Sequence, residues 1–439
     1  WLEDGFGCRS ELIHYGEWPQ ALDEYRAQAV VLPHVNGSRN QKIARVAREM
    51  GMRVVVIQTE GRPNNVETMA YTSGMFADTT NVDLWFTWSD TVRDYMIEQR
   101  LMEPSKLVVG GAHRFDVYRP DLNRLLASRG DFARKHGLDP DRPIVSWATN
   151  FTHAKFNVAN QAFLLEDWRD LGVDKLESLS DPLEFARLDW VARERSLEVM
   201  RELMRRRGDV QYILKPHPAE ELDRYREFVD ECRLTGVSAT LVAREYIWDV
   251  LNAADVHIHR LCTTGVEAWL LGVPSIELHL FDYGVWSVDL PGAAAEAMEG
   301  NDVVVDSAGL IAVADSYLRD DSVTEVQLAA RERYIRKWLH KVDGRRCYEH
   351  ARVLAELVRD RRPIGEVSHG VINRRARIRS RVNRSLGRPG HESLRFWRRG
   401  TGSGVDRLGQ LDKTIAKSDA EAWTRLAREA LREQVEATV

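Results

Sequence analysis

Short apolar runs alternate with amphipathic segments along most of the chain. Runs of four to six apolar residues bounded by turn residues are typical of buried strands, and apolar positions three and four residues apart are typical of helices. The pattern predicts strands over 29–34, 53–58, 83–88, 106–111, 141–150, 210–215, 239–243, 255–260, 274–278 and 302–306. It predicts helices over 40–50, 90–100, 322–338 and 346–359. Such alternation indicates βαβ units and parallel sheets, so we expect an α/β protein.

The predicted strands fall into two groups along the chain. We therefore expect two Rossmann-like, doubly wound domains facing each other across a cleft, the first over 1–125 and the second over 126–360. Residues 151–207 have a mostly helical pattern and are more numerous than a crossover needs, so we expect an insertion that faces the cleft. Residues 361–439 should form a basic, partly helical tail. Because the chain begins at Trp1, we expect its native start to lie upstream.

Composition narrows the class of protein. Of the 439 residues, 44% are apolar, which supplies real cores and excludes a disordered chain. The net charge of -5 argues against a protein whose whole surface binds nucleic acid. Four cysteines without metal-ligand spacing predict a reducing compartment and argue against zinc. No apolar run approaches the roughly 20 residues that span a bilayer, so we expect a cytoplasmic protein.

In an open parallel sheet, ligands bind beyond the carboxyl ends of the strands, so polar residues that follow apolar runs are the candidates. The stretch "VVVIQTEGRP" places Glu60 directly after a strand, followed by Gly61 and Arg62. A partly desolvated carboxylate at this position suits a general base. The alternative is a glutamate that caps the next helix or pairs with Arg62.

The stretch "VQYILKPHPAE" places Lys215 and His217 at the equivalent position in the second group, between Pro216 and Pro218. The prolines fix the backbone around a cation and a proton donor, which suits a phosphate or an anionic leaving group. A rigid surface turn is the alternative, and the doubled proline favours the functional interpretation.

The stretch "DVHIHRLCTTGVEAW" predicts a strand, a short loop and a helix, and His259 near the end of the strand is a further candidate for binding the nucleotide donor. Thr263, Thr264 and Gly265 stand at the helix start, where backbone N–H groups and the helix dipole favour an anion. Glu267 lies about one turn into the helix and could accept hydrogen bonds from ribose hydroxyls. Ordinary capping by threonine is the alternative.

Further polar residues follow the other strands of the first group and could line the opposite wall of the cleft. Caps and turns use the same residue types, so their shared position at strand ends is the reason for naming them. They are His34, Asn36, Ser89, His113 and Arg114, and Arg62 beside Glu60 is a further candidate on this acceptor side.

Several common sites are not encoded. The chain has no GxGxxG after a strand and no GxxxxGK[ST], which argues against a dinucleotide oxidoreductase and a P-loop NTPase. It also has no HExxH or DxD-like cluster, so we expect no required metal or other cofactor.

In order and spacing, "TEG", "KPHP" and "CTTG" with Glu267 resemble the (D/E)(D/E)G, HP and Ser/Thr motifs of a known group of enzymes. These are the bacterial GT-B glycosyltransferases that use CMP-activated acidic sugars, including sialyltransferases and the β-Kdo transferases of capsule and lipopolysaccharide. The resemblance covers about residues 30–357. It implies a GT-B-like fold, a CMP-linked sugar as donor substrate and a surface glycan or glycolipid acceptor.

The resemblance also implies roles for single residues. Glu60 would be the catalytic base, and Thr59 at the first acidic position argues against a mechanism that needs two carboxylates. His217, with Lys215 beside it, would bind the nucleotide phosphate and help it to leave. Thr263 and Thr264 would hold the same phosphate, and Glu267 would bind the ribose.

The segment from Arg361 to Arg399 contains twelve arginines and two glutamates. Such a segment could bind an anionic membrane surface, which would place the enzyme at the inner face of the plasma membrane. A solvated tail is an equal alternative, and nucleic-acid binding is less favoured.

Two other functions stay open at this point. A CDP-glycerol-type polyol-phosphate transferase would share the two-domain fold and a loop containing HP. A catalytically inactive glycan-binding or assembly protein would have kept the fold alone.

Overall fold

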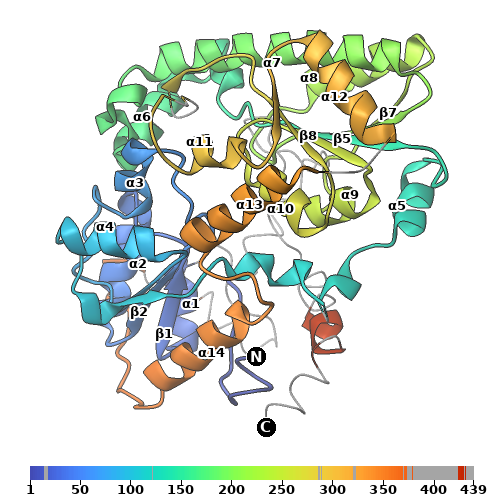
Figure 1. The fold of residues 1–439 in the computed structure, drawn as a ribbon. Coiled ribbons are helices and arrows are strands. Elements are labelled where there is room, and N and C mark those ends of the chain that lie inside the picture. Colours follow the sequence, from blue (N-terminus) through green and yellow to red (C-terminus); the bar gives the residue numbers. More distant parts are fainter. Residues whose placement is uncertain are drawn as a thin grey trace.

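The computed structural model describes residues 1–13, 18–120, 122–284, 287, 289–319, 323–368, 370–372, 378, 424–429 and 431. The described residues form two α/β domains, one at the lower left and one at the upper right of Figure 1. Each domain is built on a parallel sheet covered by helices. The predicted architecture of two Rossmann-like domains in a GT-B-like arrangement is confirmed.

The N-terminal domain contains a four-stranded parallel sheet in the order β1-β2-β3-β4. Its strands are β1 (Ala29–Leu32), β2 (Arg53–Ile57), β3 (Leu84–Thr87) and β4 (Leu107–Val109). The helices of this part of the chain are α1 (Trp18–Tyr25), α2 (Ser38–Glu49), α3 (Val66–Thr72) and α4 (Asp90–Glu98), with 3-10 turns over Pro104–Lys106, His113–Tyr118 and Asn123–Leu125. All four residues of β3 are buried, as expected of a strand that is covered on both faces.

The C-terminal domain contains a six-stranded parallel sheet in the order β10-β9-β8-β5-β6-β7. Its strands are β5 (Ile144–Ala148), β6 (Gln211–Lys215), β7 (Ser238–Leu241), β8 (Val256–His259), β9 (Ser275–Leu278) and β10 (Asp302–Val304). The chain first builds outward from β5 to β7, and then returns to the other side of β5 and builds outward from β8 to β10. Strand order therefore reverses between β5 and β8, and ligands of doubly wound sheets bind at such a point. We call it the switch point.

Helices cover both faces of the second sheet. They are α5 (Arg129–His136), α6 (Gln161–Leu171), α7 (Pro182–Arg206), α8 (Asp223–Leu234), α9 (Ile247–Ala253), α10 (Thr263–Leu270), α11 (Ala293–Met298), α12 (Ser307–Arg319) and α13 (Glu325–Tyr334), with 3-10 turns over Ala154–Asn157, Val173–Lys175 and Glu177–Leu179. The long helix α7 crosses the top of the domain in Figure 1. Its apolar face packs into the sheet core, so α7 is the crossover helix between β5 and β6. Only 151–181 of the predicted insertion is additional to that crossover.

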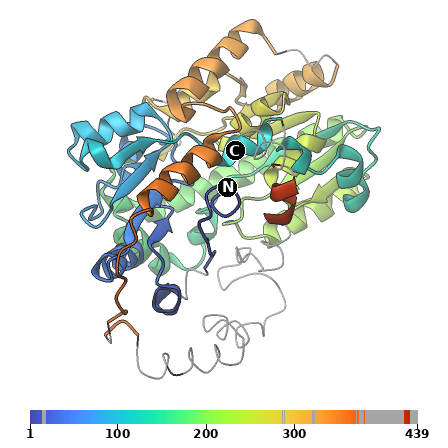
Figure 2. The ribbon, with the colours of Figure 1, turned by 90° about the horizontal axis from the view of Figure 1, so that it is seen from below.

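The path of the chain joins the two domains twice. It passes from the first to the second over 119–128 and returns through a π-helical turn, Ile335–Leu339, to α14 (Arg346–Leu357). In Figure 2, α14 lies alongside the N-terminal segment, and its Leu354 packs with Val55, Leu84 and Phe86 of the first sheet. The second domain is therefore an excursion between two segments of the first.

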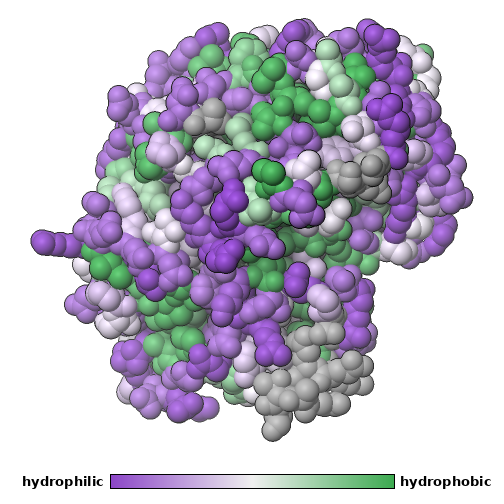
Figure 3. Space-filling view, viewed as in Figure 1, coloured by the Kyte–Doolittle hydropathy of each residue, from purple (hydrophilic) through white to green (hydrophobic). Residues whose placement is uncertain are grey.

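The two domains are in close contact. One apolar core contains Trp85 and Trp88 of the first domain together with Val266, Trp269 and Tyr334 of the second. Burial of large aromatic side chains is a major source of apolar stabilisation, so this contact holds the domains in a closed arrangement. In Figure 3, hydrophilic side chains dominate the visible face of both domains and separate small apolar areas.

No helix in the described part of the chain is long and apolar enough to cross a membrane. Apart from Ile378, residues 373–399 of the arginine-rich segment lie outside the described residues. A short helix is described over 424–429, within the tail over 361–439 that is expected to be partly helical.

Candidate functional site

The loops after β6 and β8 stand on either side of β5 at the switch point. Strands in a sheet are about 4.8 Å apart, so the ends of β6 and β8 are separated by about 10 Å. The KPHP corner (Lys215–Pro218) follows β6, and the CTTG segment (Cys262–Gly265) follows β8. The fold thus brings two predicted anion-binding segments to one edge of one sheet.

His217 begins a tight turn that ends at Glu220. The backbone N–H of Glu220 donates to the His217 carbonyl at 2.9 Å, and Pro218 occupies the second position, where its fixed φ favours a turn. The backbone N–H of Ala219 donates to Nδ1 of the half-buried His217 ring at 3.1 Å. Because Nδ1 accepts this bond, a neutral His217 imidazole carries its proton on Nε2.

Glu220 is the residue of this corner that the sequence interpretation missed. Its carboxylate is 2% exposed and accepts hydrogen bonds from the His217 backbone N–H at 3.2 Å and the Thr149 hydroxyl at 2.8 Å. The Tyr225 hydroxyl donates to its other oxygen. Burial raises the pKa of Glu220 above its ordinary value. A glutamate three residues after the histidine of a proline turn was the available signal.

Two buried lysines tie the same corner to its surroundings. Lys215, which is 6% exposed, donates from Nζ to the Ala243 carbonyl at 3.0 Å, and Lys155 donates to the Ala219 carbonyl. Burial lowers the pKa of Lys215 to about 8. Lys215 was expected to bind the donor, and the contacts described here are with the protein backbone.

The CTTG segment is anchored from beneath by two stacked histidines. The Thr264 hydroxyl lies 3.0 Å from Nε2 of His257, whose Nδ1 lies 2.9 Å from the Ser146 hydroxyl. The His259 ring lies parallel to that of His257, with 5.5 Å between the ring centroids. Burial lowers the pKa of His257 well below its ordinary value, so this ring is neutral.

His259 supports the start of α10 rather than lying at the surface. It is 1% exposed, and its Nδ1 lies 3.1 Å from Oε2 of Glu277. A Cβ on Gly265 would come within 2.2 Å of the His259 ring, so only glycine allows this close approach. Among these predicted residues, half-buried Thr263 at the first position of α10 is the one best placed to meet an anion.

Two arginines of the first domain reach the CTTG segment. Arg62 donates to the Leu261 carbonyl at 3.1 Å and also to the Tyr334 hydroxyl at 3.2 Å. Arg114 forms an ion pair with Glu267 at 3.0 Å. The first domain thus places two guanidinium groups beside the N-terminus of α10. Their positive charge adds to that of the helix dipole, and both would attract a phosphate group.

Glu267 connects the two domains in this structure. It is 1% exposed, one of its carboxylate oxygens accepts from Arg114, and the other accepts from the Tyr118 hydroxyl. Both of these donors belong to the first domain.

The TEG corner (Thr59–Gly61) follows β2 and has a different character. Glu60 is exposed, and its charge contributes to the pKa values of His34, Tyr71 and Arg114, which places its carboxylate near all three. Burial lowers the pKa of His34, whose Nδ1 lies 3.0 Å from the Asn40 amide nitrogen.

Two further predicted residues of the first domain have local structural contacts. Asn36 is buried and donates to the Tyr71 carbonyl at 2.9 Å. Ser89 is fully buried and accepts from the Val92 N–H at 3.3 Å as the N-cap of α4. Capping was the alternative for Ser89, and the geometry favours it.

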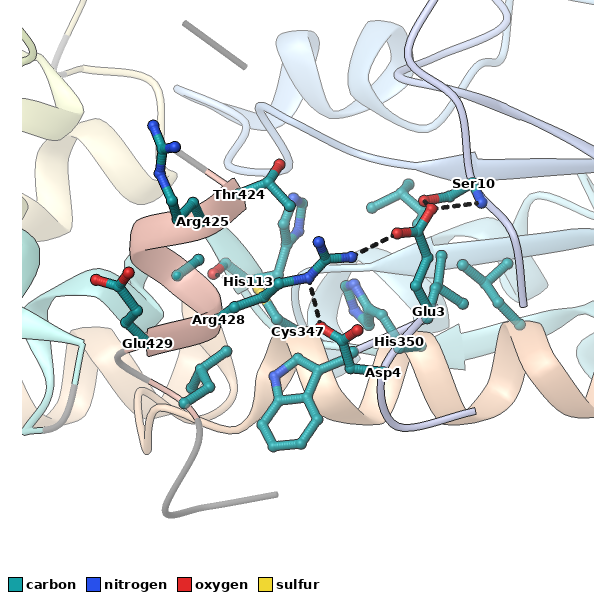
Figure 4. A pocket seen from close by; sticks show the side chains of 17 residues that line it. Glu3, Asp4, Ser10, His113, Cys347, His350, Thr424, Arg425, Arg428 and Glu429 are labelled. Carbon is teal, nitrogen blue, oxygen red and sulfur yellow. Dashed lines mark hydrogen bonds and ion pairs between the residues drawn. The ribbon is translucent and has the colours of Figure 1, made fainter. Parts of the chain in front are cut away.

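His113 lines a separate cavity of about 770 Å³ between α14, residues 1–4 and the helix over 424–429 (Figure 4). The rings of His113 and His350 are 5.0 Å apart, and burial lowers their pKa values to about 4 and about 3. Arg428 closes one side through ion pairs of 2.7 Å with Glu3 and Asp4. This cavity is distinct from the switch point.

A buried polar network stabilises the loops at the switch point. Arg260 follows β8 and donates to the Asn150 carbonyl at 3.0 Å and to Asp189 of α7 at 3.1 Å. Asp189 also accepts from the Tyr283 hydroxyl at 2.6 Å and from the His153 backbone N–H at 2.9 Å. Each donor of the buried pair is matched by an acceptor, as a buried charge requires. The sequence interpretation missed Asp189, because 71 residues separate it from Arg260.

The four cysteines are free thiols. Within the described ranges, no group of three or more His, Cys, Asp or Glu side chains is placed to hold a metal ion.

Comparison with known proteins gives likeness in structure alone. No family model matches the sequence, and no curated protein matches it. S. aureus MnaA, solved with UDP, gives a TM-score of 0.48 at 10% identity over 82% of this chain and 88% of that one. The UDP-GlcNAc 2-epimerase from Methanocaldococcus jannaschii gives 0.45 at 12% over 81% and 88%. The wall teichoic acid polymerase TagF gives 0.42 at 10% over 76% and 72%. Likenesses of this size say nothing about the reaction of this chain.

Proposed function

We propose that this chain is a GT-B glycosyltransferase that moves an acidic, Kdo-like or sialic-acid-like sugar from a CMP donor to a surface glycan or glycolipid acceptor. The observation that carries the proposal is the state of His217. The ring stands beside the switch point with Nδ1 accepting a backbone N–H, so its Nε2 is the proton donor. A leaving phosphate needs such a donor.

The positive charge around the N-terminus of α10 supports binding of the donor phosphate there. When the sugar–oxygen bond to CMP breaks, the electron pair stays on the phosphate oxygen. His217 Nε2 would donate to that oxygen, and Thr263 with the N-terminus of α10 would bind the other oxygens. Arg62 and Arg114 lie beside the same helix start and would add positive charge. Interactions that strengthen as the charge develops lower the barrier.

The exposure of Glu60 supports binding of the acceptor beside it. Glu60 is exposed at the carboxyl end of β2, with His34 and Arg114 nearby. It would take the proton from the acceptor hydroxyl as that oxygen attacks the sugar carbon. A large glycan could reach this carboxylate without displacing buried protein.

The first test is calorimetric titration of the full chain with CMP, CDP, UDP and GDP. We expect the cytidine nucleotides to bind more tightly than UDP and GDP. Equal affinity for all four would overturn the cytidine assignment. His217→Ala should weaken CMP binding, and Glu60→Gln should leave it unchanged because Glu60 lies on the acceptor side.

The second test measures CMP release from CMP-Kdo, CMP-sialic acid and CDP-glycerol with lipid-linked glycan acceptors. Release from a CMP-sugar supports the proposed reaction. Release from CDP-glycerol alone would instead identify a polyol-phosphate transferase. If none of the three donors reacts, or if both Glu60→Gln and His217→Ala leave every measured activity unchanged, a non-catalytic assembly protein is the better assignment.

The acceptor proposal includes contact with the membrane. Twelve arginines over 361–399 would attract anionic lipid by about 1 kcal/mol each near the surface. Sedimentation with phosphatidylglycerol vesicles should retain the full chain at low salt and lose it at high salt. Equal retention by neutral phosphatidylcholine vesicles would remove this part of the proposal.

A further inference from the structure

The turn that carries His217 is closed twice by one residue. The backbone N–H of Glu220 donates to the His217 carbonyl, and the Glu220 carboxylate accepts from the His217 backbone N–H. These reciprocal bonds join the first and fourth residues of the turn, with Pro218 fixing the second. Both ends of the turn therefore depend on Glu220.

The same carboxylate attaches the turn to two other elements. Thr149, directly after β5, donates to one oxygen at 2.8 Å, and Tyr225 of α8 donates to the other. A carboxylate that accepts three hydrogen bonds has its charge well satisfied despite being 2% exposed. The position of the turn relative to the switch point is thus set through Glu220.

The state of the His217 ring follows from the closed turn. The Ala219 N–H can reach Nδ1 at 3.1 Å only while the backbone between His217 and Glu220 keeps its present path. That single bond makes Nδ1 the acceptor and leaves the proton of a neutral ring on Nε2. An open turn would allow the ring to rotate and to exchange tautomers.

We propose that Glu220 is a positioning residue that keeps His217 in the Nε2-protonated form and aims this nitrogen at the donor phosphate. The aim at a phosphate rests on the proposed function, whereas the ring state does not. Glu220 itself touches no substrate. Its effect on the reaction passes through the turn.

A merely structural glutamate would stabilise the fold without fixing the ring. Three variants separate the two roles. Glu220→Gln keeps the shape, but its neutral oxygen is a weaker acceptor for the His217 N–H than a carboxylate oxygen, and its NH2 group cannot accept from Tyr225. Glu220→Asp keeps the charge and is one methylene shorter. Glu221→Gln is the matched control, because Glu221 is adjacent and its carboxylate pairs with Arg193 of α7 at 2.8 Å.

The first readout is the ring state of His217 in the protein without substrate. Proteins labelled with ¹⁵N-histidine are compared by long-range ¹H–¹⁵N correlation, and the His217→Asn variant identifies the His217 signals. We expect wild type and Glu221→Gln to show the Nε2–H tautomer and Glu220→Gln to show averaged nitrogen shifts. Identical shifts in wild type and Glu220→Gln would overturn the proposal.

The second readout is steady-state kinetics with the donor that wild type uses. Misplacement of a catalytic group by about 1 Å can cost about 100-fold, so Glu220→Gln should lower kcat by about 10- to 100-fold with a small change in KM. Glu220→Asp should recover part of this loss. A rise in KM at unchanged kcat would assign Glu220 to binding and contradict positioning.

The two readouts fail separately. If wild type has no transferase activity, the proposed function is wrong, and the nitrogen shifts still decide whether Glu220 controls the ring. If Glu220→Gln does not fold, Tyr225→Phe replaces it, since this change removes one donor from the same carboxylate. Unchanged His217 shifts in Tyr225→Phe would then count against the proposal.

Discussion

The KPHP corner and the TEG corner both place polar residues directly after a buried strand, yet they are built in opposite ways. The first is fixed by two prolines, by the buried Glu220 and by the backbone contacts of Lys155 and Lys215. The second exposes Thr59 and Glu60 to solvent, and only Gly61 is buried there, against Trp88. The KPHP corner is fixed before any substrate binds, and the TEG corner is accessible to solvent.

This difference matches the two tasks that the proposed reaction sets. A leaving phosphate develops charge at a defined place, so its donor gains from being held rigidly before the reaction. An acceptor glycan is large and can approach from several directions, so the catalytic base that meets it must be exposed. The comparison therefore predicts effects on both rate and stability at the KPHP corner, and effects on rate without loss of stability at the TEG corner.

The largest expected effect is on rate. His217→Ala should lower kcat by about 10²- to 10³-fold, because one fixed donor to the developing charge is lost. The half-buried ring contributes little to folding, so the melting temperature should stay close to that of wild type. Steady-state kinetics and a thermal melt measure both. A wild-type rate in a folded variant would remove His217 from the mechanism.

The next effect is on stability and contrasts the two glutamates. Glu220→Ala should lower the free energy of unfolding by about 3 kcal/mol, because two buried hydroxyl donors and one partly buried backbone N–H lose their acceptor. Glu60→Ala should change it by less than about 0.5 kcal/mol, as expected for an exposed side chain. Urea unfolding followed by circular dichroism provides the comparison. Equal losses would show that the two corners are equally rigid.

A smaller effect is expected at the glycines of the two sites. A Cβ at Gly61 would come within 2.3 Å of the Trp88 ring, and one at Gly265 within 2.2 Å of the His259 ring. Gly61→Ala and Gly265→Ala should each cost about 1 to 3 kcal/mol through overpacking. Gly208 has no atom within 4 Å of its Cβ position, so Gly208→Ala is the control and should be close to neutral. Urea midpoints at equal slope would report all three.

The smallest effect concerns pH and the first domain. Burial depresses the pKa of His113 to about 4 and that of His350 to about 3, so the unfolded chain binds protons first. The stability contributed by each neutral ring is therefore present above pH 6.5 and is lost as pH falls towards 4. The loss should reach about 1 to 2 kcal/mol per histidine by pH 5. His350→Phe should flatten the pH dependence of the urea midpoint relative to wild type, and an unchanged slope would contradict this assignment.

The strands could be predicted from the sequence, but the contacts between residues far apart in the chain could not. Each of the ten predicted strands is present, because a buried parallel strand is a continuous apolar run that sequence shows directly. The KPHP and CTTG segments were found because candidate ligand-binding residues lie directly after such runs. Glu267, for which ribose binding stays a prediction, is bonded to Arg114 and Tyr118, which are 153 and 149 residues away. No local pattern specifies a pairing of that separation.

Some residues near the site could have been found from local rules. Glu220 lies three residues after His217, in a turn whose proline and histidine were already noticed. A hydrogen bond from its carboxylate back to this turn could therefore have been predicted. Ser89 stands where an N-cap is preferred, and it caps α4. Asp189 lies on α7 and meets Arg260 only because the crossover helix packs over the sheet.

The two crossings of the chain between domains restrict how substrates enter and leave. Two bodies joined at two points keep one rotation that leaves both connections in place, here about the line through residues 119–128 and the π-helical turn at 335–339, and this rotation would also have to open the apolar core that the domains share. Such a hinge would part Arg114 from Glu267 and Arg62 from Leu261, which lie on opposite sides of the domain boundary. Under the proposed function, both arginines would hold the domains together before the donor binds and would bind its phosphate once these contacts have opened.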